Sequence, residues 1–420
     1  MQLTHKIEMK VNVTQAAYFR KAAGTARFVW NWGLAEWRVQ FLAGKKPNAM
    51  ALKKQFNAIK YQAFPWLKEI HRDAHAQPFM HLNKAYRRFF NEIKSNKNAH
   101  PPRFKKKGKC HDSFYVANDK FTIRDQTIQL PKIGLVKLTE PLRFSGKIVG
   151  ATISRTADRW FVAIQIDVPE NEATKKRIAH GIEGVDLGIK AAVTLSTGES
   201  IEAPKPLKSL LRRLQMRARS VSRKCEAEKI SLGLMKNQRL PKGTKLPLSN
   251  NLKKSSLQLA KLHARIANLR VDFVHKLTTR LCLENQAIVI EDLNVAGMLK
   301  NEKLSRAIAD VGFGEIRRQL EYKSLRYQTK LIVADRFYPS SKLCSNCNVK
   351  NEALTLHDRE WTCANCGAHH HRDINAAINL KRLATATALP EANSLVTMDT
   401  GVGMVPALDG KVTSVRYECG

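Results

Sequence analysis

Three acidic residues occur where the sequence predicts the end of a strand or the start of a helix. Asp186 ends an apolar strand over 182–187, Glu291 ends the apolar run AIVI, and Asp373 opens the last predicted helix. In an α/β sheet, strand ends and the adjoining helix starts gather at one edge, where ligands bind. Three carboxylates at that edge could hold two Mg²⁺ ions roughly 4 Å apart, which can activate a water and stabilise the leaving oxygen of a phosphodiester.

Each carboxylate also has an ordinary structural interpretation. An Asp after a strand is often a turn residue, and Asp373 suits a helix N-cap or first turn without any catalysis. Glu291 is followed by Asp292, and strand alternation directs only one of the two into a given site. The residues alone therefore leave the choice between Glu291 and Asp292 open.

Four of the eight cysteines form two Cys-x-x-Cys pairs. Fifteen residues separate the pairs, and this spacing predicts a zinc ribbon with one ion held by Cys344, Cys347, Cys363 and Cys366. Most sites of four cysteines are structural, so we assign this one no catalytic role. The histidines at 369–371 are not needed as ligands, and we expect them to approach phosphate or solvent.

The charge balance indicates a polyanionic partner. The chain has 72 basic and 36 acidic residues, a formal net charge of +36. Residues 93–109 hold seven basic residues and no acid, and residues 201–270 hold eighteen against three. Nucleic acid would neutralise this charge and release counterions on binding. A solvated basic surface, or one at a membrane, is the alternative; the size and recurrence of the excess favour nucleic acid.

The element pattern predicts several units in these 420 residues. Residues 15–98 are typical of a small helical domain with an aromatic core, and short strands up to about residue 168 suit a small β-barrel or sandwich. A strand over 2–12 could join those strands, which would make the helical domain an insertion. No apolar run reaches the roughly 18 residues that cross a bilayer, and the N-terminus lacks a signal peptide's apolar core. We therefore expect a soluble, cytoplasmic protein without a membrane partner.

Five segments, in order, resemble the split RuvC-like nuclease and zinc ribbon of TnpB proteins, the transposon-encoded relatives of miniature type V CRISPR effectors. They are GVDLGIK, VIEDLNV, YPSSKLCSNC, CANCG and HRDINAAINL, spread over roughly 180–385. Each motif alone is weak, but the ordered set is specific. The N-terminal half is similar in layout, with FNEIK followed by PPRFKKKG. One departure is His371, since many relatives carry an acid before the Arg-Asp pair.

The resemblance implies a multidomain α+β fold, in which a helical recognition lobe is inserted in a β-barrel wedge domain and an RNase H-like (RuvC) α/β nuclease domain carries an inserted zinc ribbon. The implied boundaries are wedge 1–14 and 99–179, recognition 15–98, nuclease 180–336 and 367–386, ribbon 337–366, and a disordered tail 387–420.

The resemblance also implies residue roles. Asp186, Glu291 rather than Asp292, and Asp373 match the catalytic carboxylates, which would bind two Mg²⁺, and the four cysteines match the ligands of one structural Zn²⁺. Gln77 aligns with a glutamine that the family uses near the motif flanking the target, and a Gln amide can pair with adenine edges. The residues that we expect to contact nucleic acid are Gln77, Arg103, Lys105, Lys106, Lys107 and Arg372.

The expected function is that of an RNA-guided DNA endonuclease. It would bind a non-coding guide RNA, recognise a short target-adjacent motif, and hydrolyse phosphodiesters of double-stranded and single-stranded target DNA by two-metal catalysis. We expect a monomer on one RNA, with a dimer left open, acting in the prokaryotic cytoplasm at the nucleoid. The alternatives are a nuclease-inactive RNA-guided regulator and a transposase, since acidic triads also serve strand transfer.

Overall fold

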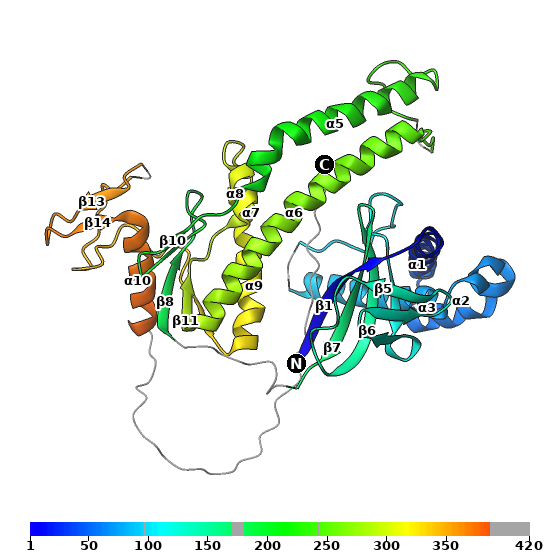
Figure 1. The fold of residues 1–420 in the computed structure, drawn as a ribbon, viewed down its shortest axis with the longest axis horizontal. Coiled ribbons are helices and arrows are strands. Elements are labelled where there is room, and N and C mark those ends of the chain that lie inside the picture. The colour runs from blue at the N-terminus through cyan, green and yellow to red at the C-terminus, as the bar shows by residue number, and fades with distance from the viewer. Residues whose placement is uncertain (96–97, 170–179, 242, 356, 387–420) are drawn as a thin grey trace, which may run out of the picture.

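The computed structural model describes residues 1–95, 98–169, 180–241, 243–355 and 357–386. The tail expected at 387–420 lies outside these residues. Within them the protein is a mixed α/β chain built around two separate sheets (Figure 1). No described helix combines the length and the apolar character needed to cross a membrane.

The first sheet has seven antiparallel strands in the order β2-β6-β7-β1-β5-β4-β3. Its first strand, β1 (Gln2–Lys10), pairs with β7 (Arg159–Asp167) from Gln2 opposite Asp167 to Met9 opposite Trp160. The N-terminal strand therefore joins the sheet, as the sequence suggested. The remaining strands are β2 (Ser113–Ala117), β3 (Thr122–Arg124), β4 (Thr127–Leu130), β5 (Gly134–Leu138) and β6 (Lys147–Thr156).

The predicted barrel is not closed in the described residues. Strands β2 and β3 lie at opposite ends of the strand order, and each pairs with one neighbour, β6 and β4 respectively. Alternation still builds a core on one face, because every second residue of β7, from Trp160 to Ile166, is buried. The core is closed by helix α1, whose Phe19 ring lies 5.2 Å from that of Trp160. A helix therefore covers the face that strand closure would otherwise have to seal.

In the sequence, a group of helices lies between β1 and the next strand of this sheet. They are α1 (Val13–Leu42), α2 (Ala49–Ala63), the 3₁₀ turn Pro65–Glu69 and α3 (Arg72–Lys94); a second 3₁₀ turn, Asn118–Lys120, follows β2. Asn12 begins α1 with a capping box, accepting from Gln15 N at 2.8 Å. Aromatic residues pack between the three helices, including Trp37 stacked on Tyr86 at 3.9 Å. The aromatic pattern of 15–98 is therefore a helical core, as predicted.

The second sheet has five strands in the order β10-β9-β8-β11-β12. Strands β8 (His180–Asp186), β11 (Asn285–Ile290) and β12 (Lys330–Val333) are parallel, whereas β9 (Val193–Leu195) and β10 (Ser200–Ile201) return antiparallel.

Helices cover both faces of this sheet. Ile288 and Ile290 pack with the core of α6 (Asn250–Glu284) and α9 (Phe313–Tyr327), whereas Val289 packs with Leu380 of α10 (Arg372–Ala386). Figure 1 shows α10 on the opposite side of β8 and β11 from α6 and α9. The strand alternation thus assigns each residue of β11 to a defined helical layer.

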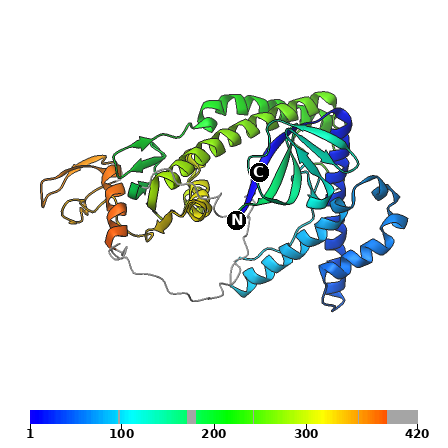
Figure 2. The same ribbon diagram turned by 60° about the horizontal axis from the view of Figure 1, so that its bottom comes forward.

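Two further features extend from this unit. Helix α5 (Pro206–Ile230) and the start of α6 form a long hairpin that reaches over the first sheet (Figures 1 and 2), where Lys261 of α6 pairs with Asp158 at 2.6 Å. Short helices α7 (Val295–Met298) and α8 (Ser305–Val311) follow β11. A small hairpin, β13 (Glu360–Thr362) with β14 (His369–His371), leads directly into α10.

Candidate active site

Strand register brings Asp186 and Glu291 to the same end of adjacent parallel strands. Val185 of β8 lies opposite Ile290 of β11. The next residue along each strand is a carboxylate, Asp186 after Val185 and Glu291 after Ile290. Asp373 lies in the first turn of α10, which packs against β8. The three predicted carboxylates line one cleft of about 1030 Å³.

A glycine permits the close approach of α10 to β8. A Cβ placed on Gly184 would lie 1.9 Å from the carbonyl oxygen of Ala377 and 2.6 Å from the backbone nitrogen of Lys381. No side chain fits there, so only glycine allows the helix backbone to rest on the strand. Gly184 is two residues before Asp186, and Ala377 is one helical turn after Asp373. This contact therefore sets the spacing between the two carboxylates.

The alternation of β11 separates Glu291 from Asp292. Val289 faces α10, so Glu291 two positions later faces α10 and the cleft, where it accepts a hydrogen bond from Ser340 Oγ at 2.6 Å. Asp292 faces the other way and pairs with Arg317 of α9 at 3.0 Å and with Arg336 at 2.5 Å. Those arginines hold the pKa of Asp292 below its ordinary value, Arg336 contributing most.

The cleft is electrostatically suited to a cation. Desolvation, together with the nearby charges of Glu291 and Asp373, raises the pKa of Asp186 to about 8. Among the described residues, the only group of three or more metal-binding side chains with ligand atoms within 4.8 Å of one another is the cysteine cluster. The ligand atoms of the three carboxylates therefore do not all lie within 4.8 Å of one another.

Basic side chains that the sequence analysis did not identify line the same cleft. Arg359 Nη1 lies 3.3 Å from both carboxylate oxygens of Asp373, and His357 also lines the cleft. Arg359 reaches Asp373 because the backbone N–H of Arg372 donates to Arg359 O at 2.7 Å, next to the Glu360–His371 pair of the β13–β14 hairpin. The contact between Arg359 and Asp373 depends on the register of this hairpin, which the sequence spacing alone does not predict.

The four cysteines come together as predicted, with ligand atoms that all lie within 4.8 Å of one another, in a cluster that could bind a zinc ion. Cys344, Cys347 and Cys363 pack with Leu354 and Trp361. A hydrogen bond from the backbone N–H of Val349 lowers the pKa of Cys347 to about 6, which favours the thiolate that binds metal. The prediction for the histidines is wrong for His370, whose Nε2 lies 3.0 Å from Cys344 Sγ rather than toward phosphate or solvent.

The residues expected to contact nucleic acid lie in three separate places. Arg372 lines the cleft, and Gln77 of α3 lines a hollow of about 320 Å³ with Lys53, Asn57, Arg72 and Tyr115. The run 103–107 crosses α1 instead, and its backbone is fixed there. Trp30 Nε1 donates to Arg103 O at 3.0 Å, and Asn31 exchanges two hydrogen bonds with the Lys105 backbone, at 2.8 and 2.9 Å.

This anchoring makes the basic run a preorganised surface. The side chains of Lys106 and Lys107 are exposed, whereas the Lys105 ammonium lies over the Trp30 ring at 4.2 Å. A backbone held in place loses little further conformational freedom when its side chains bind a partner. The run is therefore suited to phosphate contact through Lys106 and Lys107 more than through Lys105.

Family models match three parts of the chain. Residues 313–380 match the Cas12f1-like TNB domain, residues 162–302 match a model described as "Probable transposase", and residues 1–46 match one described as "Helix-turn-helix domain". In this structure residues 1–46 form strand β1 and the single long helix α1.

Whole-chain comparisons agree with these matches. A protein of Streptomyces pristinaespiralis named "Putative RNA-guided DNA endonuclease" is 36% identical over 373 residues, covering 87% of this chain and 85% of its own. One of Escherichia coli (strain K12), "Putative RNA-guided DNA endonuclease InsQ", is 29% identical and covers 89% and 90%. A "TnpB-like protein" of Acanthamoeba polyphaga mimivirus is 22% identical over 59% of this chain and 45% of its own.

The fold has a counterpart among solved structures. The protein chain in the structure titled "Cryo-EM structure of the Cas12f1-sgRNA-target DNA complex" superposes with a TM-score of 0.54 at 15% identity, covering 88% of this chain and 83% of that chain. The similarity extends over both sheets, because its coverage is nearly that of the described residues. Together with the strong match to the Streptomyces protein, it shows that the chain belongs to the TnpB-type family of transposon-encoded RNA-guided DNA endonucleases.

Proposed function

We propose that this protein is an RNA-guided DNA endonuclease that cuts with Asp186, Glu291 and Asp373. The observation that carries the proposal is the convergence of these carboxylates, from segments up to 187 residues apart, in one cleft rimmed by Arg359 and Arg372. Carboxylates in so basic a protein would repel a phosphodiester unless a cation lay between them. A nuclease-inactive regulator is the weaker alternative, because none of the three carboxylates is lost.

In the proposed mechanism the three carboxylates hold the ions, and the rest of the cleft orients them. Asp186, Glu291 and Asp373 would hold two Mg²⁺ ions, which would supply Lewis-acid stabilisation of the phosphodiester. The hydroxyl of Ser340 fixes one oxygen of Glu291, which leaves the other free to bind. Arg359 and Arg372 place positive charge at the rim, where a phosphate oxygen enters. Arg359 pairs with Asp373 at 3.3 Å, and its guanidinium would also be placed to donate to a phosphate oxygen at this rim.

The predicted domains fit the same function. We infer that residues 1–14 and 99–179 form the wedge unit, 15–98 the recognition lobe, 180–336 and 367–386 the nuclease, and 337–366 a ribbon with one structural Zn²⁺. Guide RNA and target DNA are the proposed partners, with base pairing reading the sequence and the protein reading the flanking motif. The hollow around Gln77 suits that role, because it combines the Gln77 amide with the cationic side chains of Lys53 and Arg72.

The direct test of this function is cleavage of a matched plasmid by the protein purified with its RNA. With Mg²⁺ present, the wild type is expected to cut, and Asp186→Ala is expected to bind RNA and target but not to cut, because it removes one of the three proposed metal ligands. Asp272→Ala, in an exposed ion pair with Lys276 on α6, is the control and is expected to cut like the wild type. Equal cutting by Asp186→Ala and wild type would contradict the site.

Removing a cysteine ligand is expected to release zinc and to reduce cutting. Cys363→Ser breaks the four-thiolate set, and the ribbon that positions Arg359 and leads into α10 should loosen, because such sites supply folding energy. Elemental analysis is expected to find one zinc per wild-type chain and far less in Cys363→Ser. Cys225→Ser, at a half-buried thiol on α5, should keep its zinc and its activity. A wild-type chain with no zinc, or a variant with full zinc, would refute the assignment.

A further inference from the structure

Helix α5 carries more positive charge than its own structure explains. Between 208 and 224 it has seven basic residues and no acidic one. Three like-charged pairs are spaced four residues apart, where side chains meet on the helix surface: Lys208 with Arg212, Arg213 with Arg217, and Arg219 with Arg223. Such pairs destabilise a helix. In the protein alone, these like-charged pairs therefore destabilise α5.

The core gives α5 little support. Of its 25 residues only Pro206 is buried, although long helices usually owe their stability to a buried apolar face. Its contacts with α6 include polar ones, from Lys224 to Ser255 Oγ and from Arg217 to Gln258 Oε1.

The first turn of α5 is held by hydrogen bonds to a buried carboxylate. The buried carboxylate of Asp310 accepts from the backbone N–H groups of Leu207 and Lys208, both at 2.9 Å, and pairs with Arg270 at 2.8 Å. Asp310 also lines the cleft that holds the three carboxylates. Beyond this point α5 packs along α6 on one side, where residues such as Leu214 and Val221 are half-buried, and its other side is exposed.

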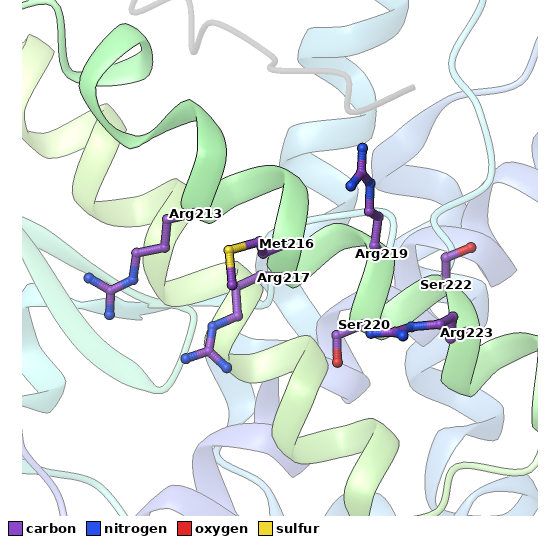
Figure 3. A pocket seen from close by; sticks show the side chains of 7 residues that line it. All are labelled: Arg213, Met216, Arg217, Arg219, Ser220, Ser222 and Arg223. Atoms are coloured by element: carbon purple, nitrogen blue, oxygen red, sulfur yellow. The ribbon is translucent and has the colours of Figure 1, made fainter.

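Four arginines of α5 line a hollow of about 750 Å³, together with Met216, Ser220 and Ser222; they are Arg213, Arg217, Arg219 and Arg223. Figure 3 shows Arg213 and Arg217 on one side of α5 and Arg219 projecting from the other. In the described part of the chain, none of the four lies within ion-pair distance of a carboxylate. We call these four residues the α5 arginine cluster.

We propose that the α5 arginine cluster is a docking surface for the phosphate backbone of the guide RNA, an inference that rests on the proposed function. Guanidinium groups match phosphate geometry, and a polyanion would relieve the like-charge repulsion along the helix. A partner that stays bound suits this surface, because the exposed side of α5 carries the repelling arginines whenever the protein is folded. RNA meets this requirement, whereas target DNA arrives and leaves with each reaction.

A membrane does not fit this surface. Along α5, which lies wholly within the described part, the exposed large apolar side chains are Met216, at 60%, and the terminal Ile230, at 54%. Helices that lie on membranes need a broad apolar face opposite their basic face. A single methionine between arginines instead suits contact with a sugar or a base edge beside the phosphates.

The test compares two triple variants with the same change in net charge. Arg213→Gln, Arg219→Gln and Arg223→Gln together remove three charges of the cluster, and Gln keeps nearly the helix propensity of Arg. The control combines Lys120→Gln, Lys276→Gln and Lys350→Gln, whose lysines already pair with acids at 2.6–2.7 Å. The probe is the RNA that copurifies with the wild type, transcribed in vitro, and its Kd is measured across salt concentrations, alongside that of a single-stranded DNA of equal length.

The arginine variant is expected to bind the RNA at least tenfold more weakly at low salt. The slope of log K against log salt should fall in magnitude by about 2, because each contact with a single-strand phosphate contributes about 0.7. The unfolding temperature of the RNA-free variant should be equal to or higher than that of the wild type, because like-charged pairs are gone. A merely structural role for the arginines would lower that temperature instead. The control should match the wild type in RNA binding.

Three outcomes would overturn the inference. They are an RNA slope equal to the control's, a loss of DNA binding without loss of RNA binding, and a fall in RNA affinity that follows a fall in unfolding temperature. A wild type that retains no discrete RNA and cuts nothing would overturn the proposed function itself. A wild type that binds RNA and cuts, beside an arginine variant with an unchanged slope, would overturn this inference alone.

Discussion

Glu291→Gln is expected to abolish DNA cleavage, whereas Asp292→Asn at the adjacent position is expected to preserve it. The two substitutions are chemically equivalent, and each removes one negative charge. Glu291 faces the cleft, and its loss deprives the proposed ions of a ligand, so cutting should fall by on the order of 1000-fold, the equivalent of about 4 kcal/mol in the barrier. Cleavage of a matched plasmid by each RNA complex, measured over time with Mg²⁺, provides the comparison.

Asp292→Asn gives this experiment its control. Asp292 lies on the opposite face of β11 and pairs with Arg317 and Arg336, so its replacement should cost stability rather than chemistry. Both pairs are open to solvent, which screens their charges, so they contribute only modestly to stability. A modest fall in unfolding temperature with near-normal cutting is the expected pattern. If Asp292→Asn were the inactive variant and Glu291→Gln the active one, the assignment of the strand faces would be wrong.

Gly184→Ala is expected to lower the cleavage rate strongly, although it adds only one methyl group. The new Cβ would lie 1.9 Å from Ala377 O, so α10 must move away from β8 and carry Asp373 away from Asp186. A misplacement of about 1 Å in a catalytic constellation can cost about 100-fold in rate, and overpacking of this kind typically destabilises by about 1–3 kcal/mol. We therefore expect a cleavage rate at least 100-fold lower and a lower unfolding temperature, with RNA affinity nearly unchanged.

Gly181→Ala is the matched control in the same strand. A Cβ on Gly181 meets no atom within 4 Å, so this substitution should leave both rate and stability close to those of the wild type. The rate would be measured by plasmid cleavage and the stability by thermal unfolding of the RNA-free protein. Normal cutting by Gly184→Ala would mean that the spacing of Asp186 and Asp373 does not depend on this contact.

The elements of the site could be predicted from the sequence because their signals are local. Asp186, Glu291 and Asp373 follow apolar strands or open a helix, and the cysteine pairs have a fixed spacing. The choice between Glu291 and Asp292 could not be made from the residues, because it depends on which helix covers which face of β11. That assignment comes from the separation of Val289 from Ile288 and Ile290 between two cores.

Other features depend on contacts between distant segments and left no local signal. Arg359 reaches Asp373 because of the register of the β13–β14 hairpin, whose two strands have three residues each. The same hairpin places His370 next to Cys344. The short strands of the first sheet could be anticipated from turns and alternation, but whether they close into a barrel could not. Packing of α1 on the sheet face decides that point, and neither strand length nor composition encodes it.

The order of the three carboxylates along the chain has a consequence for biosynthesis. Asp373 follows Asp186 by 187 residues, and α10, which carries it, is the last described element. At about 5–20 residues per second, a ribosome needs roughly 10–40 s to travel between these two codons. In the later part of this interval, once α6 has been made, the nascent chain has its basic helical hairpin but still lacks one carboxylate of the proposed cutting centre. Engagement with RNA can therefore begin during translation, before the chain is able to damage DNA.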